Sequence, residues 1–155
     1  MTKKRTAIRR VAFYVLMMVM ACALLLIVKT DKVHAASKGT YYYVGSFNPT
    51  GQYQTGAIKK AYLKGSKLVV KGSLLRYTPK NYKTYSNSEY LKSKTRKFKL
   101  TKNTKYKTGS GYSGWQNVSK SYFNKWIKGL SKSQNGLGFI IKVKNGKVVW
   151  MKTSP

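Results

Sequence analysis

The chain has 155 residues, and its 32 Lys and Arg side chains stand against two acidic residues, Asp31 and Glu89, for a formal net charge of +30. Its single His and single Cys, His34 and Cys22, both lie within residues 1–36. The rest of the chain therefore lacks the residues for paired-carboxylate, His-based or Cys-based catalysis and for ordinary zinc or calcium sites, and its charge indicates an anionic partner.

Residues 1–36 are predicted to be a secretory signal peptide. A basic stretch, Lys3–Arg10, precedes an uninterrupted apolar run over 11–28, and the small residues Ala35 and Ala36 offer signal-cleavage positions. The alternative is an uncleaved N-terminal anchor, because an apolar run of this length reaches the lower limit for a spanning helix. Either reading exports the remainder of the chain, since the positive charges precede the apolar run.

Cys22 lies in the middle of this apolar run. A lipid-attachment Cys is expected at the end of such a run, so we interpret Cys22 as a small apolar residue of the signal.

Residues 37–155 are predicted to form a single basic, β-rich domain. Seven of the basic residues lie in 1–36, so the remaining 119 residues carry 25 basic side chains and one acidic side chain, a net charge of +24. This length is sufficient for a hydrophobic core without disulfides. An exported domain without Cys is typical of a secreted or cell-surface protein of a Gram-positive bacterium.

The first elements expected along this domain are strands. A strand is expected over Thr40–Val44, followed by a hairpin over Gly56–Leu75 whose turn is Gly65-Ser66. This turn places Leu63 opposite Leu68 and Ala61 opposite Val70. The alternation of basic and apolar residues over Arg96–Thr101 predicts a further, half-buried strand.

A helix is predicted over Ser119–Gly129. Its apolar residues follow helical spacing, Ser119 is a suitable N-cap, and Gly129 is a suitable terminator. The predicted buried stripe consists of Phe123, Trp126, Ile127 and Leu130.

The C-terminal segment is predicted to be a hairpin over Leu137–Lys152. Its turn is Asn145-Gly146, a pair that tolerates the positive φ angles of a type I′ turn. The register expected from this turn places Val143 opposite Val148, Ile141 opposite Trp150 and Ile140 opposite Met151.

Apart from the strand near Tyr41, which could cover an edge of the sheet, the element order is strand, strand, strand, helix, strand, strand. This order matches an OB-fold, so we expect a mainly β domain with one short helix, in the form of a small OB-like, partly open β-barrel. A small β-sandwich, or a sheet with one packed helix, is the alternative.

Two segments carry a resemblance to other proteins. They are Phe98–Tyr106, with the sequence FKLTKNTKY, and Asn135–Trp150, with the sequence NGLGFIIKVKNGKVVW. With these segments the chain, from about Gly56 to Met151, resembles small secreted single-domain β-rich proteins of Gram-positive bacteria. The resemblance implies no catalytic or binding residues.

No enzymatic motif is found. No Ser stands three residues before a Lys, so the Ser-x-x-Lys pattern is absent, and the Gly-rich segment Thr108–Gly114 lacks the Gly-Lys-Ser/Thr ending of a phosphate loop. We therefore expect a protein that is not an enzyme, with no cofactor and no metal. Tyr112 and Trp115, in and just after this segment, remain candidates for lining a ligand groove.

The segment Arg76–Lys99 interleaves tyrosines with basic residues, and Lys105 and Lys107 follow on a strand expected just before the Gly-rich segment Thr108–Gly114. Lys and Arg neutralise phosphates, while aromatic rings stack on sugars or bases. The alternative is a solvated basic loop whose tyrosines pack on the domain. The candidate polyanion-binding residues are Tyr77, Lys80, Tyr82, Lys83, Tyr85, Lys92, Lys94, Arg96, Lys97, Lys99, Lys105 and Lys107.

The charge and the absence of catalytic groups predict a monomeric, non-enzymatic binding module. Its expected partners are anionic polymers of the cell envelope, such as teichoic acids, or anionic lipids. One alternative function is that of a cationic antimicrobial or membrane-active protein. The other is binding of extracellular nucleic acid through an OB-like groove, because nucleic acid is also a polyphosphate.

Overall fold

Eight strands and two helices make up the part of the chain that the structure describes. The structure is a computed structural model, and it describes residues 38–49, 56–110, 114–132 and 136–154. In chain order the elements are β1 (Thr40–Phe47), β2 (Ala57–Lys64), β3 (Lys67–Tyr77), α2 (Pro79–Thr84), β4 (Glu89–Lys99), β5 (Lys105–Ser110), β6 (Gly114–Asn117), α3 (Lys120–Leu130), β7 (Gly138–Lys144) and β8 (Lys147–Ser154).

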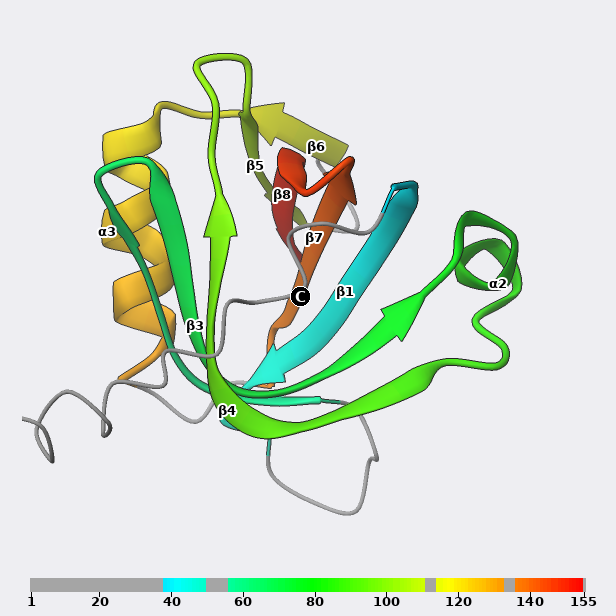
Figure 1. The fold of residues 1–155 in the computed structure, drawn as a ribbon. Helices are drawn as coiled ribbons and strands as arrows, with labels where there is room; N and C mark the ends of the chain where they lie inside the picture. The colour runs from blue at the N-terminus through cyan, green and yellow to red at the C-terminus, as the bar shows by residue number, and fades with distance from the viewer. Residues whose placement is uncertain (1–37, 50–55, 111–113, 133–135, 155) are drawn as a thin grey trace, which may run out of the picture. The chain divides into compact units, whose positions relative to one another are not determined.

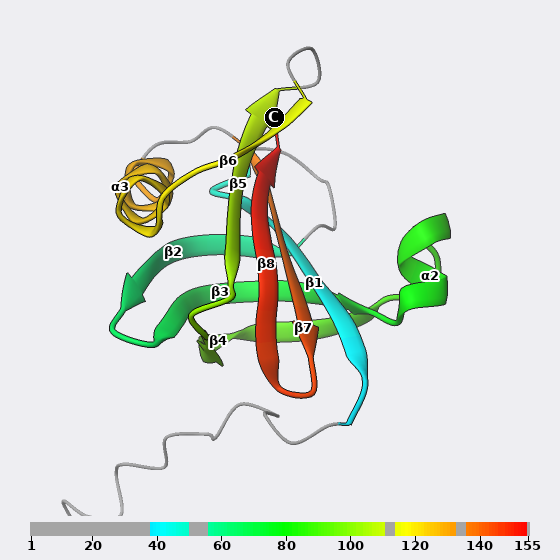
Figure 2. The ribbon, with the colours of Figure 1, turned by 90° about the horizontal axis from the view of Figure 1, so that it is seen from above.

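The strands form one strongly curved sheet (Figures 1 and 2). Its order is β4-β3-β2-β1-β7-β8-β5-β6, and additional pairings join β3 to β1 and β4 to β8. β8 runs parallel to both β4 and β5, and β1 runs parallel to β2, whereas the other neighbours are antiparallel. The prediction of a mainly β fold with a short helix is confirmed at this level.

The core lies between the inner face of the curved sheet and α3. Its largest fully buried side chains include three phenylalanines, Phe47, Phe123 and Phe139. Two side chains of α3 and of the turn after it also accept hydrogen bonds from β2: Asn124 Oδ1 from the Leu63 N–H at 2.8 Å, and Ser131 Oγ from the Ala61 N–H at 3.0 Å. α3 is therefore fixed to the sheet by both apolar and polar contacts.

Both predicted hairpin turns are present. Leu63 pairs with Leu68 and Ala61 with Val70 across the first turn, as predicted. In the second turn, Asn145 and Gly146 have φ angles of 49° and 72°, which confirms the positive φ angles expected there. The predicted strand at Thr40–Val44 is present too and extends to Phe47 as β1.

The register of the second hairpin differs from the prediction beyond its first pairs. Val143 pairs with Val148 as expected, but a bulge follows, and Trp150 pairs with Lys142 instead of Ile141. Consequently Ile141 pairs with Met151, and Ile140 pairs with Lys152. The extra residue moves Trp150 to the outer face of the sheet, while Met151 takes the core position.

α3 begins at the predicted cap and ends slightly later than predicted. The Ser119 hydroxyl accepts a hydrogen bond from the Tyr122 N–H at 3.2 Å, and the helix continues through Gly129 to Leu130. Phe123, Ile127 and Leu130 are buried as expected. Trp126 was predicted in the same stripe but is 40% exposed, and its indole N–H donates to Thr153 Oγ1 at 3.1 Å.

The helix α2 has no counterpart in the predicted elements. Thr78 caps it, Pro79 occupies its first turn, and it is only six residues long. β6 is also new, since no strand is predicted over 114–117.

Within the described ranges, no helix is both long and apolar enough to cross a membrane. The predicted signal segment, including Ala35 and Ala36, lies outside the described residues, as does Tyr112.

Candidate functional site

Tyrosines from three elements gather around α2. Tyr42 of β1 stacks on Tyr82 of α2 with ring centroids 4.0 Å apart and an interplanar angle of 1°. Tyr77 and Tyr85 contact Tyr82 with centroid distances of 6.2 and 5.4 Å. Burial, followed by a hydrogen bond with Tyr85, raises the pKa of the Tyr82 phenol well above its ordinary value. The cluster anchors α2 against the outer face of the sheet.

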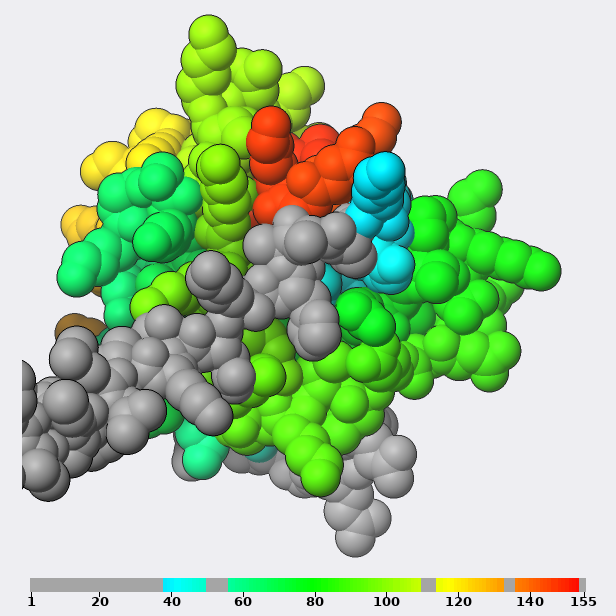
Figure 3. Space-filling model, viewed as in Figure 1, coloured from blue at the N-terminus to red at the C-terminus, as the bar shows by residue number. Residues whose placement is uncertain are grey.

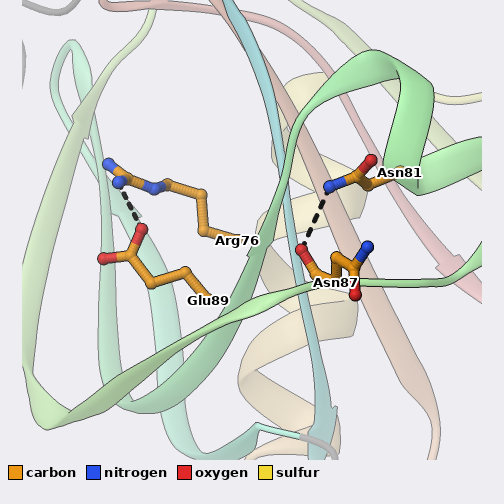
Figure 4. A network of polar contacts seen from close by, with 4 residues as sticks. All are labelled: Arg76, Asn81, Asn87 and Glu89. Atoms are coloured by element: carbon orange, nitrogen blue, oxygen red, sulfur yellow. Dashed lines mark hydrogen bonds and ion pairs between the residues drawn. The ribbon is translucent and has the colours of Figure 1, made fainter.

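Short polar contacts complete this corner of the molecule. The Asn81 side chain of α2 donates to the Asn87 carbonyl oxygen at 3.1 Å and closes the turn that leads into β4 (Figure 4). The same view shows Glu89 at the start of β4 forming an ion pair with Arg76 of β3. Arg76 also lies over the Tyr41 ring, 5.1 Å from its centroid.

A row of aromatic and basic side chains crosses the outer face of the sheet from this cluster. Tyr42 of β1 is opposite Lys142 of β7, Lys142 is opposite Trp150 of β8, and Trp150 is level with Lys105 of β5. Their chain neighbours on β1, β7 and β8 belong to the core, so this row points away from it. The Lys142 ammonium lies 5.5 Å from the Tyr42 ring centroid.

The next row on the same face contains a lysine between two tryptophans. Lys152 of β8 is paired with Lys107 of the parallel strand β5. The Lys152 ammonium lies 4.1 Å from the Trp115 ring centroid and 5.6 Å from the Trp150 ring centroid. Burial, followed by repulsion from Lys107, lowers the pKa of Lys152 below its ordinary value. An anion bound here would raise the pKa of Lys152 again, because a nearby opposite charge favours the protonated ammonium.

We call this surface the aromatic–lysine face. Its members combine aromatic rings with ammonium groups held over or beside them, an arrangement that positions the cations by cation–π attraction. The face consists of Tyr42, Tyr82, Lys105, Lys107, Trp115, Lys142, Trp150 and Lys152.

The one acidic side chain of the described residues does not neutralise this face. Glu89 forms an ion pair with Arg76, which lies on β3 next to the tyrosine cluster. The lysines of β5, β7 and β8 therefore have no carboxylate partner within the described ranges.

The predicted polyanion-binding residues separate into several locations. Lys105 and Lys107 belong to the aromatic–lysine face, as does Tyr82, while Tyr85 lies beside Tyr82 and is 64% exposed. Tyr77 is only 5% exposed and acts as packing under the cluster. The remaining lysines of the prediction are exposed on α2 and β4: Lys80, Lys83, Lys92, Lys94, Lys97 and Lys99.

Arg96 requires a correction, because the structure places it in the interior. It is 4% exposed, and its guanidinium donates to two backbone carbonyl oxygens, that of Gly72 at 2.9 Å and that of Lys92 at 2.7 Å. Burial lowers the pKa of this guanidinium relative to its ordinary value. Arg96 therefore supports the backbone of β3 and β4, and we leave it out of the anion-binding surface.

Four members of the aromatic–lysine face were missed by the sequence reasoning: Tyr42, Lys142, Trp150 and Lys152. Trp150 and Lys152 were obscured by the bulge in the last hairpin, which reverses the faces expected for them. Their approach to β5 depends on a parallel pairing between distant segments, and no local pattern signals such a pairing. Trp115, by contrast, was considered as a groove residue.

A second basic feature lies between β2 and the end of α3. It is an open depression of ≈ 550 Å³ whose lining includes four lysines, Lys59, Lys60, Lys128 and Lys132. Its charge adds to the overall positive surface, and the Lys60 ammonium lies 5.7 Å from the centroid of the Tyr62 ring, but its lining includes no tryptophan.

The described residues contain no group of three or more His, Cys, Asp or Glu side chains that is placed to hold a metal ion. No protein-family description, curated protein or solved structure matches the chain.

Proposed function

We propose that the chain is a secreted, non-enzymatic binding module that adheres electrostatically to anionic polymers of the cell envelope, such as teichoic acids. The observation that carries this proposal is the aromatic–lysine face. It presents four lysines beside aromatic rings, and one of them, Lys152, lies between two tryptophan rings and level with Lys107.

The overall charge supports the same proposal. Residues 37–155 carry 25 basic side chains and one acidic side chain, and that acid forms an ion pair with Arg76. Such a body is drawn to any dense polyanion, and teichoic-acid phosphates are the abundant ones outside a Gram-positive cell. The signal-like segment at residues 1–36 supports export to that location.

We further propose an OB-like, partly open barrel as the architecture of the domain. The pairings β1–β3, β3–β4, β4–β8, β8–β7 and β7–β1 support it, because they link five strands in a closed cycle. The position of α3 between the strand pair β5–β6 and β7 also agrees with the OB order. The β4–β8 link consists of one paired position, Lys99 with Lys147, which accounts for the partly open description.

Nucleic acid is the second candidate ligand. Trp115 is 42% exposed and Tyr85 is 64% exposed, so some ring surface near the lysines remains open for base stacking. A membrane-active role has less support, because α3 buries Phe123, Ile127 and Leu130 in the core and does not present them to a lipid surface.

The proposal is tested by measuring binding to purified poly(glycerol phosphate) over a range of salt concentrations. The full chain is expressed in a Gram-positive host and purified in the form that the host delivers. We expect binding at low salt that weakens linearly on a log–log plot as salt rises, because each lysine–phosphate contact releases counterions. An uncharged polysaccharide of similar length serves as control. Equal binding to both polymers, or binding that is unchanged in molar salt, would contradict the proposal.

A further inference from the structure

Lysines flank the two-residue turns of the hairpins β2–β3 and β7–β8. Lys64 and Lys67 pair across the turn between β2 and β3, and Lys144 and Lys147 pair across the turn between β7 and β8. Both turns have only two residues, so each pair of lysines is held at the last paired position of its hairpin. Lys99, at the end of β4, stands between the two hairpins.

The register joins these five lysines into one continuous line. Lys67 pairs with Lys99, and Lys99 pairs with Lys147, so the order across the sheet is Lys64, Lys67, Lys99, Lys147 and Lys144. We call this line the lysine row. Neighbouring strands lie about 4.8 Å apart, so its four steps extend over roughly 20 Å.

All five side chains point away from the core. Each has a neighbour in the chain that is buried in the core, and side chains alternate between the two faces of a strand. The five lysines themselves are exposed. Figure 1 shows the β2–β3 turn, the end of β4, the β7–β8 turn and the start of β1 following one another along one rim, and Figure 3 shows the same segments next to one another at the surface.

The lysine row has no acidic counterpart within the described residues. Glu89 is at the opposite end of β4 from Lys99 and forms an ion pair with Arg76. Like charges directly opposite one another in a sheet are destabilising. Four such neighbouring contacts in succession oppose folding of the free protein, and an external polyanion removes that opposition.

The lysine row also meets the aromatic–lysine face. On β7, Lys142 lies two residues before Lys144 and therefore on the same side of the strand, and Lys142 is opposite Trp150. An extended chain that leaves the row at β7 thus reaches the ammonium groups of the aromatic–lysine face.

We infer that the lysine row is a track for one linear phosphodiester polymer, which lies across the ends of the strands and continues onto the aromatic–lysine face. This inference rests on the proposed function and specifies its binding site. The row itself consists of lysines alone, so it offers contacts for phosphates and no ring on which a base stacks. That composition favours a polymer without bases, of the poly(glycerol phosphate) type, over nucleic acid.

The test compares two variants with the same net charge. The row variant replaces Lys64, Lys67, Lys99, Lys144 and Lys147 with Gln. The control variant replaces five exposed lysines on other parts of the surface with Gln: Lys59, Lys71, Lys125, Lys128 and Lys132. Both are produced as the full chain in a Gram-positive host, and circular dichroism and thermal melting establish that each is folded.

Affinity for poly(glycerol phosphate) is then measured against salt concentration. At about 0.7 counterions per phosphate contact, loss of five contacts reduces the slope by about 3.5 and weakens binding at 0.15 M salt by several hundred-fold. The control variant is expected to lose less than about tenfold and to keep most of its slope, because its lysines act only at a distance.

Three results would overturn parts of this reasoning and are distinguishable. Equal losses in the two variants would refute the lysine row and leave diffuse electrostatic adhesion standing. Failure of the parent protein to bind at low salt would refute the proposed function itself. Tighter, row-dependent binding of a single-stranded oligonucleotide with the same number of phosphates would refute the polymer class and favour nucleic acid.

Discussion

Arg96→Met is the most informative single substitution, because it separates a structural cation from a binding cation. Arg96 is 4% exposed and donates to the carbonyl oxygens of Gly72 and Lys92. Met keeps much of the buried chain volume and removes both hydrogen bonds.

The size of the effect follows from these two bonds. Hydrogen bonds from a charged donor contribute about 1.5–3 kcal/mol each. Burying the guanidinium opposes folding and offsets part of that gain. We therefore expect Arg96→Met to lower the free energy of unfolding by about 2–3 kcal/mol. For a domain of this size, that corresponds to a fall in Tm of about 10 °C.

The assay is urea unfolding followed by tryptophan fluorescence, with the m-value used to check that the unfolded states are comparable. Lys97→Met is the matched control, because Lys97 is the next residue on β4, carries the same charge and is exposed. We expect the control to change stability by less than about 0.5 kcal/mol, as is usual for surface sites. A stable Arg96→Met variant with strongly reduced polymer affinity would refute the structural role and restore Arg96 to the binding surface.

Three further predictions concern the site and the backbone. At a pH between the lowered pKa of Lys152 and its ordinary value of 10.5, polymer binding should take up protons. In the same pH range the fold should gain stability as the pH rises, because Lys152 binds more protons in the unfolded chain than in the folded one. Calorimetry in two buffers measures the proton uptake, which Lys152→Met should abolish. Trp115→Ala should weaken polymer binding about two- to fivefold, because it removes the ring under Lys152, whereas Tyr122→Ala on α3 should leave the affinity unchanged. Equal losses of affinity in a binding titration would contradict the cation–π role. Gly72→Ala should destabilise the fold by about 2–3 kcal/mol, because Gly72 has a φ of 142° and a Cβ there collides with a β2 carbonyl. Gly129→Ala, in the open surface of α3, should instead raise the free energy of unfolding by about 0.5–1 kcal/mol. Urea unfolding measures both effects, and a neutral Gly72→Ala would refute the backbone argument.

Local signals in the sequence were sufficient for the hairpin turns and for α3. Asn145-Gly146 and Gly65-Ser66 specify turns through their φ preferences, and the spacing of the apolar residues specifies the buried side of α3. These features depend on residues close to one another in the chain, so they are readable without the fold.

The site depended on features that no local pattern encodes. One bulge between Val148 and Trp150 exchanged the faces of Trp150 and the residues around it, so an aromatic ring expected in the core lies among surface lysines. The parallel pairing of β5 with β8 then brought Lys107 beside Lys152. Arg96 was misassigned for a different reason: its alternation with Phe98 is a local pattern that indicates an inward-facing side chain, but its charge concealed this.

The same charges act in opposite directions on folding and on binding, and salt separates the two effects. In the free protein, the lysines of the lysine row repel one another, and Lys107 repels Lys152. Added salt should screen this repulsion and raise the Tm. In the complex, added salt competes with the phosphates and should lower the affinity. If these lysines had no part in polymer binding, added salt would raise the Tm but would not lower the affinity. Melting curves of the free protein and binding curves with poly(glycerol phosphate), measured over one salt series, should therefore move in opposite directions, and both trends should diminish together in the variant that lacks the lysine row.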